Sequence, residues 1–447
     1  MKLDWKKTFL IGLGFFGVSV MWPIYNSFVP LFLQAGRAGF VSSRNVLGFG
    51  LSEPVTGVIM GLDNIAALFI LPAIGFWSDR VRTRIGRRYP FILSAVPVAA
   101  VSFILLPIAA RMIDSTANGS VEENLPAFIL FMAGAILMLL AMAVMRTPIV
   151  SLMPDVTPSP LRSKANGVIN FMGGVAFIIA QFILARLFDI NTLLPFLSAS
   201  VVLAAVIVLL FLTVKEPDVD SLSAPEPHEE SEEEQALRGL KSLAAIPTES
   251  RRSLIFLMLA ICSWFIGYDG MGTFFTSYAV NVLGVSEGLA PTLFGVAGLT
   301  FIIFAIPAGF IGERLGRRRT IGLGLIIFAA LLVIGFFVRS MYVIAAILGL
   351  GGIGWALINI NSLPMVVDTT DDERLVGTFV GFYYLASQFG SAVAPAITGS
   401  VINLFGSDFR MIFLSSPFFF VLAIIFMVLV TRGEAHPARS TSTSGAR

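Results

Sequence analysis

GFWSDRVRTRIGRRYPF at residues 75–91 is repeated in shortened form as GFIGERLGRRRT at residues 309–320. In each stretch an acid, Asp79 or Glu313, follows an apolar run and precedes a cluster of arginines. The two stretches begin 234 residues apart (309 − 75). A repeat of this kind predicts that the chain consists of two homologous halves.

The composition is typical of a membrane protein. The chain of 447 residues is 56% hydrophobic and 13% charged, whereas soluble domains carry roughly 25% charged residues. A helix needs about 20 apolar residues to cross about 30 Å of hydrocarbon. This rule predicts twelve transmembrane helices, six in each half, at approximately 8–33, 53–77, 90–110, 127–152, 163–187, 193–214, 254–280, 289–312, 320–338, 341–366, 375–402 and 409–431.

The repeat and one long polar interruption predict the domains. We expect an N-terminal six-helix bundle at 1–214 and a C-terminal one at 253–432. Between them lies an acidic stretch at 215–252, rich in Glu, Ser and Pro as in disordered linkers, and a disordered tail follows at 433–447. The predicted fold class is an all-α polytopic membrane protein. Its two bundles are related by a pseudo-two-fold axis along the membrane normal, as in carriers that work by alternating access.

Basic residues gather on one side of the predicted helices. Lys2, Lys6 and Lys7 precede the first span, and arginine clusters follow the second and the eighth. Because Lys and Arg are retained in the cytoplasm, we expect both termini and the linker to be cytoplasmic, in a cell inner membrane. The net charge of +2 gives no reason to expect a nucleic-acid partner.

The residues that usually carry enzyme chemistry are scarce. Cys262 is the single cysteine, and His228 and His436 fall in the predicted linker and tail. We therefore expect no disulfide, no metal site and no histidine catalysis within the membrane. The glycine-rich loops lack the G-x4-G-K-[ST] pattern that binds nucleotide phosphates, so the energy for transport would come from an ion gradient. No enzyme activity and no cofactor other than the coupling ion are expected.

The two loop stretches resemble the signature of the major facilitator superfamily, and the predicted topology is similar over essentially the whole chain. Residues 78–91 are also similar to the S-D-x4-R-x-G-R-R-x-P-F loop of sucrose/proton symporters and the related glycoside–pentoside–hexuronide cation symporters. RTPIVSLMPD at 146–155 and RSKANG at 162–167 look like the bacterial branch. The resemblance implies a monomeric carrier of a sucrose- or maltose-like sugar. Val150 departs from the plant sucrose carriers, which place an arginine at that position.

The loop motifs suggest a conformational role. An acid beside arginines can pair with one of them, or accept hydrogen bonds from amides at a helix N-terminus. Our hypothesis is that the motif residues form latches that favour the outward-facing state; the alternative is that they only set the topology. The latch residues are Gly75, Asp79, Arg80, Gly86, Arg87, Arg88, Asp155 and Arg162 in the first half, and Gly309, Glu313, Arg314, Gly316, Arg317, Asp368 and Arg374 in the second.

Three predicted spans contain a charge far from the membrane surface. Such residues are costly to insert, so they are candidates for function. Asp63 lies ten residues after Glu53, about 15 Å into its helix. We predict that it carries the coupling proton, with Asn64 as a hydrogen-bond partner and Arg146 as a counter-ion or a sugar ligand. Asp269 is the rival carrier, a static Asp63–Arg146 pair is the structural alternative, and sodium is the alternative ion.

A sugar site needs planar hydrogen-bonding groups and an aromatic face for the ring. Asn359 and Asn361 are about 200° apart around a helix, so we expect only one of them to face the cavity. The same expectation, that one of the two faces inward, applies to Tyr383 and Tyr384. For any single candidate, helix packing is an equal alternative. The substrate-binding candidates are Trp22, Tyr25, Asn26, Asn64, Asn170, Tyr268, Asn359, Asn361, Tyr383, Tyr384 and Gln388.

These observations favour one function over two others. The leading prediction is a secondary active carrier that moves a sugar together with a cation, most simply a proton. The alternative is export of drugs or other amphiphiles by proton antiport, although the fifth helix lacks the proline of such antiporters. A membrane-embedded enzyme or receptor would need a catalytic constellation or a large ligand-binding loop, and the sequence indicates neither.

Overall fold

The computed structural model describes residues 4–157, 161–216, 248–369 and 376–434. Arg374, both histidines and most of the predicted linker and tail lie outside these residues. The described chain contains twelve helices long and apolar enough to cross a membrane, which confirms the predicted number. They are α1 (Trp5–Gln34), α2 (Glu53–Arg80), α3 (Tyr89–Arg111), α4 (Leu125–Val156), α5 (Arg162–Ile179) with its continuation, α6 (Leu194–Thr213), α8 (Thr248–Leu283), α9 (Ala290–Leu315), α10 (Arg317–Phe337), α11 (Met341–Val367), α12 (Val376–Leu404) and α13 (Ile412–Leu429).

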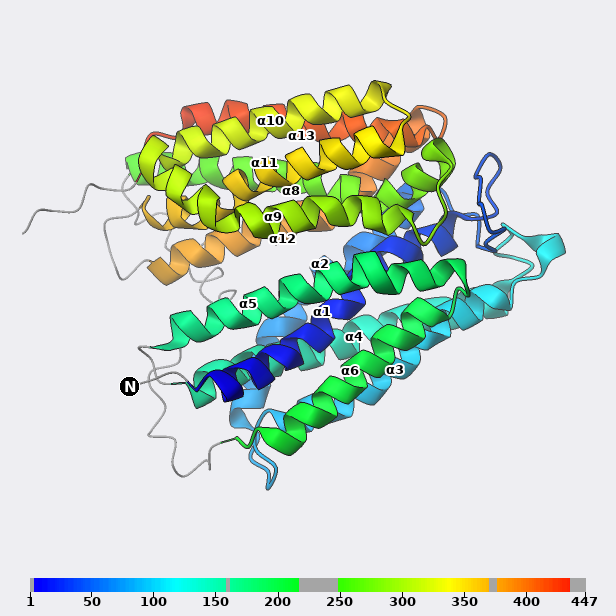
Figure 1. The fold of residues 1–447 in the computed structure, drawn as a ribbon, viewed down its shortest axis with the longest axis horizontal. Helices are drawn as coiled ribbons and strands as arrows, with labels where there is room; N and C mark the ends of the chain where they lie inside the picture. The colour runs from blue at the N-terminus through cyan, green and yellow to red at the C-terminus, as the bar shows by residue number, and fades with distance from the viewer. Residues whose placement is uncertain (1–3, 158–160, 217–247, 370–375, 435–447) are drawn as a thin grey trace, which may run out of the picture.

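Each half has its own apolar core. In the N-terminal half, α1 packs against α4, α5 and α6, and the rings of Phe28 and Phe188 stack at 4.2 Å. In the C-terminal half, α8 packs against α12 and α13 around the fully buried Trp264 and Phe328. Figure 1 shows the two bundles lying side by side along their length. The buried residues of the two cores are therefore separate clusters.

The two ends of the bundle differ, and we name them by what lies there. The terminus side is the end at which α1 begins and α6 and α13 end (Figure 1). The far side is the opposite end, where residues 35–52 connect α1 to α2. The arginine motifs therefore lie on the terminus side, after α2 and α9.

On the far side, polar groups of one half bond to polar groups of the other. Ser42 and Ser43 of the first half donate to the buried carboxylate of Glu287 in the second. Asp189 of the first half accepts in return from Ser286 at 2.6 Å. Among the described residues, further hydrogen bonds across the halves join the N–H groups of Ser43 and Arg44 to Glu287, Arg37 to Asn403, Val41 to Asn281, Ser277 to Gln34, Gly288 to Asp189 and Thr292 to Gln181.

The halves also meet where α2 crosses α12. A Cβ atom on Gly57 would lie 2.2 Å from the carbonyl oxygen of Pro395, and one on Gly61 would lie 2.1 Å from that of Ala392. No side chain fits at such distances, so the G-x3-G pattern of α2 brings the two backbones into direct contact. This crossing and the polar bonds close the far side.

The fifth span is not the uninterrupted helix predicted at 163–187. The α-helix ends at Ile179, a π turn follows at Ala180–Leu184, and a 3₁₀ turn completes the span at Ala185–Asp189. The corresponding span of the second half, α12, is helical from Val376 to Leu404. The hydrophobic pattern records which residues are apolar but not how the turns are wound, so it could not reveal this break.

Candidate functional site

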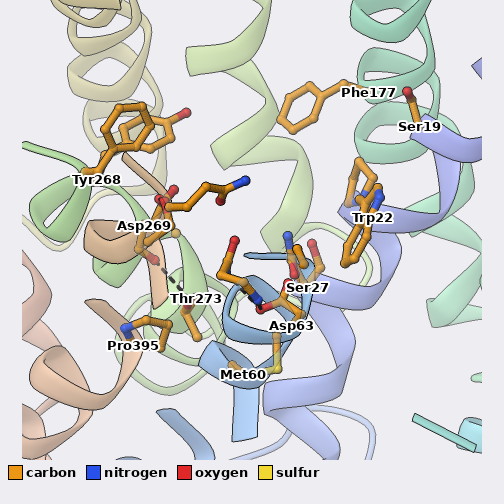
Figure 2. Close-up of a pocket in the computed structure, with 18 of the residues that line it drawn as sticks. Ser19, Trp22, Ser27, Met60, Asp63, Phe177, Tyr268, Asp269, Thr273 and Pro395 are labelled. Carbon is orange, nitrogen blue, oxygen red and sulfur yellow. Dashed lines mark hydrogen bonds between the residues drawn. The ribbon is translucent and has the colours of Figure 1, made fainter. Parts of the chain in front are cut away.

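A cavity of about 480 Å³ lies between the halves, in the middle of the bundle. Helices α1, α2, α4 and α5 line it from the first half, and α8, α9 and α12 from the second. Figure 2 shows Trp22, Asp63 and Met60 facing Tyr268, Asp269 and Thr273 across it. The site is therefore built from both halves.

Asp63 reaches this cavity from the middle of α2. Its Oδ1 accepts from the backbone N–H of Asn64 at 2.7 Å and from the Asn64 side-chain amide at 2.8 Å. The predicted partnership of the two residues is confirmed. In the repeat, 234 residues on, Ala297 is buried between helices and carries no charge. The position that corresponds to Asp63 in the second half therefore carries no carboxylate.

Asp269 reaches the same cavity from α8 in the other half. Its carboxylate accepts a short hydrogen bond from the Ser391 hydroxyl on α12. The preceding ring, Tyr268, also lines the cavity and stacks on Trp355 with ring centroids 4.0 Å apart. Asp269 is therefore held by two helices of its own half, whereas Asp63 is held by its own helix.

Arg146 lines the cavity from α4. All three charges predicted within the membrane thus open into one space, two acids and one base. Trp22, Asn26 and Gln388 line the same cavity, as predicted. The carboxylates thus lie on opposite walls, with amides and aromatic rings beside them.

A second cavity of about 520 Å³ adjoins the first and shares Phe265, Gln388 and Ser391 with it. It is lined by uncharged residues of the second half, Asn359 among them. Asn361 is buried and donates to the carbonyls of Ala308 and Leu357. Of the two asparagines, Asn359 faces this second cavity, whereas Asn361 faces neither cavity and joins α11 to α9.

Three other candidates need correction. Tyr25 is fully buried against its own half and does not line either cavity. Asn170 lies on an exposed face of α5, where its side chain donates to the Asn166 carbonyl at 3.0 Å. Tyr383 and Tyr384 both line the second cavity, contrary to the expectation of one, because that cavity is wide enough to be reached by positions about 100° apart on a helix.

Several lining residues were not predicted. Gln181, Thr273 and Ser391 are single polar residues within apolar predicted spans, and no motif marks them in the sequence. Single Ser, Thr and Gln residues are common at helix interfaces, so they carry no distinct signal. A signal for Ser391 exists only in three dimensions, in its bond to Asp269.

On the terminus side, the motif of the first half forms a closed cluster of charges. Arg88 is buried and pairs with Asp79 at 2.5 Å and with Asp155 at 3.0 Å. Arg87 pairs with the same Asp155 at 2.5 Å. The carboxylate of Glu216, just after α6, accepts from the backbone N–H groups of residues 87–89 and so caps the start of α3.

The remaining motif residues of this loop bond locally. Arg162 donates to the carbonyls of Pro154 and Thr157, Arg80 lies over the ring of Phe76, and Gly86 has a φ of +108° that favours glycine. Gly75 packs on Thr147. The predicted pairing of the motif acid with an arginine is confirmed for Asp79, and the pair lies within one half.

The second half repeats the cluster in a more exposed form. Arg317 pairs with Asp368, and Glu434, just after α13, caps the start of α10 by accepting from the N–H groups of Arg317 and Arg318. Gly316 has a φ of +87°. Gly309 packs on Ile360, whereas Glu313 and Arg314 are exposed. The two halves thus share one charged framework, which supports the repeat found in the sequence.

Curated relatives are transporters, each matched over part of its length. The chain is 25% identical over 253 residues to the cis,cis-muconate transport protein of Acinetobacter baylyi, covering 56% of this chain and 60% of that one. It is 36% identical over 143 residues to the dipeptide and tripeptide permease B of Photorhabdus luminescens, covering 29% and 28%. The chain therefore spans between about a quarter and three-fifths of the length of these relatives.

Solved structures share the fold at low identity. The nucleoside transporter NupG superposes with a TM-score of 0.69 at 13% identity, covering 95% of this chain and all of that one. A bacterial homologue of the human lysosomal transporter Spinster gives 0.66 at 16% identity, covering 96% and 97%. The family described as MFS/sugar transport protein matches residues 10–432. The chain belongs to this family of major facilitator membrane transporters.

Proposed function

We propose that this protein is a symporter that moves a sugar together with a proton across the cell inner membrane. The observation that carries the proposal is the composition of the central cavity. Two acids from opposite halves, Asp63 and Asp269, face a space that also offers Trp22, Asn26 and Gln388. A carboxylate that alternates between wet and dry surroundings can bind and release a proton, and the amides and rings suit a polyhydroxylated ring.

The direction of the open pathway follows from charge. Arg80, Arg82 and Arg84 lie on the terminus side, and positive residues favour the cytoplasm. With the terminus side in the cytoplasm, the far side faces outward, and its bonds between the halves close the outer entrance. The structure then corresponds to an inward-facing state. In this state Asp79 pairs with Arg88 of its own half, and the hypothesis that the motif residues favour the outward-facing state stays a proposal.

Asp63 is the proposed proton carrier. It lies on the helix that crosses α12 at the closed far side, two residues beyond Gly61. A change of its charge therefore acts next to the contact that has to separate. Asp269 is the second titratable group of the site, and Arg146 serves as counter-ion or as a donor to sugar hydroxyls. Sodium is the alternative coupling ion, and the protein is proposed to act as a monomer.

One observation favours a different solute. Arg146 is exposed to the cavity and would pair with a carboxylate, and one relative is described as a muconate transporter. Proton-coupled uptake of an organic acid is therefore the second candidate. Proton-driven export of amphiphiles has weaker support, because the cavity carries three charges.

The proposal is tested by uptake into proteoliposomes. Labelled sucrose, maltose and cis,cis-muconate are offered under an imposed inward proton gradient, and separately under a sodium gradient, to wild type and Asp63→Asn. Proton-driven accumulation of a sugar that is lost in Asp63→Asn is the expected result. Accumulation of muconate alone would replace the sugar with an organic acid. Accumulation of sugar that is unchanged in Asp63→Asn would remove the assigned coupling role.

A further inference from the structure

The break in the fifth span has a defined hydrogen-bond pattern. The N–H of Ala185 donates to the carbonyl of Ala180, five residues back, instead of to Gln181, four residues back. The carbonyl of Gln181 thereby loses the donor that an α-helix would supply four residues on. It accepts instead from the hydroxyl of Thr292 at 3.0 Å, and Thr292 belongs to α9 of the other half. Because of the π turn, the main-chain carbonyl of Gln181 forms a contact between the halves.

The side chain of the same residue faces the central cavity. Gln181 lines it, and its Oε1 accepts from the Ser27 hydroxyl of α1 at 3.4 Å. One residue therefore contacts the space proposed for the solute through its side chain and holds the opposite half through its main chain. Among the described residues that line the cavity, Gln181 is the one for which both contacts are present.

The segment beyond the turn leads to the far-side contact. The 3₁₀ turn ends at Asp189, whose carboxylate accepts from the Ser286 hydroxyl at 2.6 Å and from the Gly288 N–H at 2.9 Å. A Cβ on Gly295 would lie 2.8 Å from the Phe182 ring, so α9 lies directly on the segment. A shift of the π turn is therefore passed on to both contacts with the second half.

We propose that Gln181 is a positioning residue that links the central cavity to closure of the far side. When the solute site changes, the side chain of Gln181 moves, the π turn shifts, and the bonds to Thr292 and Ser286 are made or lost. The inference rests on the proposed alternating access, and it holds for any solute. It assigns the link to the first half, because α12 of the second half has no such turn.

The experiment measures how readily the cavity is reached from outside. Met60→Cys, a buried residue of the cavity wall, is introduced with Cys262→Ser, and intact cells are treated with a membrane-impermeant maleimide. Into this background are placed Thr292→Val, which removes the donor, Gln181→Ala, which removes only the side chain, and Thr300→Val. Thr300 is the matched control, because its hydroxyl bonds within α9.

We expect Thr292→Val, which loses one buried hydrogen bond across the halves, to speed labelling roughly fivefold over the background. Gln181→Ala keeps that acceptor but loses the bond to Ser27, and the proposed shift of the π turn should speed labelling to a similar extent. Thr300→Val and Thr292→Ser are expected to label at the background rate. If Thr292→Val accelerates labelling and Gln181→Ala does not, the cavity and the gate are independent and the inference is wrong. Equal rates in all variants would also overturn it. Labelling needs no transported solute, so a failure of the sugar proposal leaves this outcome readable.

Discussion

The two sides of the bundle use polar groups in opposite ways. On the terminus side, the ion pairs among the described residues lie within one half, as with Arg88 and its acids or Arg317 and Asp368. On the far side, carboxylates such as Glu287 and Asp189 are held by the opposite half. The terminus-side pairs therefore stabilise each bundle, whereas the far-side bonds stabilise one arrangement of the two bundles. A mutation on the terminus side should therefore lower the stability of one bundle. A mutation on the far side should instead shift the equilibrium between the closed and open arrangements of the two bundles.

The largest expected effect tests the ion pairs of the terminus side. Arg88→Ala removes the partner of Asp79 and leaves Asp155 with Arg87 alone, in a cluster where the Arg88 side chain is 6% exposed. Breaking such a buried pair costs about 3–5 kcal/mol. Arg317→Ala should cost about 1 kcal/mol, because the Asp368 side chain is 37% exposed and water screens the pair. Thermal unfolding of the purified variants in detergent measures both. Equal losses would show that the two clusters are energetically alike.

The next effect tests the crossing of α2 and α12. Gly57→Leu places a side chain where the carbonyl of Pro395 already lies 2.2 Å from the Cβ position. Overpacking costs about 1–3 kcal/mol, which is roughly 5- to 150-fold in the closed-to-open equilibrium. Maleimide labelling at Met60→Cys should rise by that order, and uptake should fall. Gly322→Leu is the control, since its Cβ would meet open space on α10. Labelling that stays slow in Gly57→Leu would show that the crossing does not close the far side.

A smaller effect compares two acids that accept hydrogen bonds, Glu287 from the opposite half and Glu216 from its own half. Glu287→Gln removes a charge that accepts from Ser42 and Ser43 across the halves, and hydrogen bonds to a charged group are worth about 1.5–3 kcal/mol. Labelling from outside should rise about tenfold with little change in thermal stability. Glu216→Gln, which caps α3 within its own half, should lower stability and leave labelling unchanged. The comparison of the two sides fails if both variants behave alike.

The smallest effect concerns a far-side acid that bonds within its own half. Hydrogen bonds from the Arg410 guanidinium hold the pKa of Asp408 below its usual value. Because the folded pKa is depressed, the pair stabilises the protein above the unfolded pKa of about 3.9 and this contribution is lost as the pH falls further. The pair is partly exposed, so less than about 1 kcal/mol is involved. Asp408→Asn should lower the melting temperature slightly at pH 6 and by less at pH 3; outside labelling should not change.

Much of the fold could be predicted from the sequence because lipid imposes a simple rule. A run of about 20 apolar residues becomes a helix, and the repeated motif orders the helices into two halves. The charges Asp63, Asp269 and Arg146 could be selected because a charge within the membrane is costly without a function. All three line one cavity.

The rest depends on contacts between distant residues. Tyr25, Asn170 and Asn361 have the chemistry of a sugar ligand, but rotation about the helix axis directs them elsewhere, and boundaries that are uncertain by a few residues leave that rotation undetermined. Ser391 and Gln181 are functional candidates only through a partner on another helix. The π turn at Gln181 has no counterpart in the hydrophobic pattern, because it changes how the backbone is wound and not which residues are apolar.

The most direct test of the account is a reversible disulfide across the far side. Ser286→Cys and Asp189→Cys, in a Cys262→Ser background, replace two short side chains bonded at 2.6 Å across the halves. Ser253→Cys and Thr431→Cys form the matched pair, bonded at 2.9 Å within the second half on the terminus side. The account predicts that oxidation stops uptake in the first pair, that reduction restores it relative to the same unoxidised variant, and that the second pair transports in both states. Undiminished uptake with the first disulfide formed would contradict the claim that the halves separate at the far side during transport.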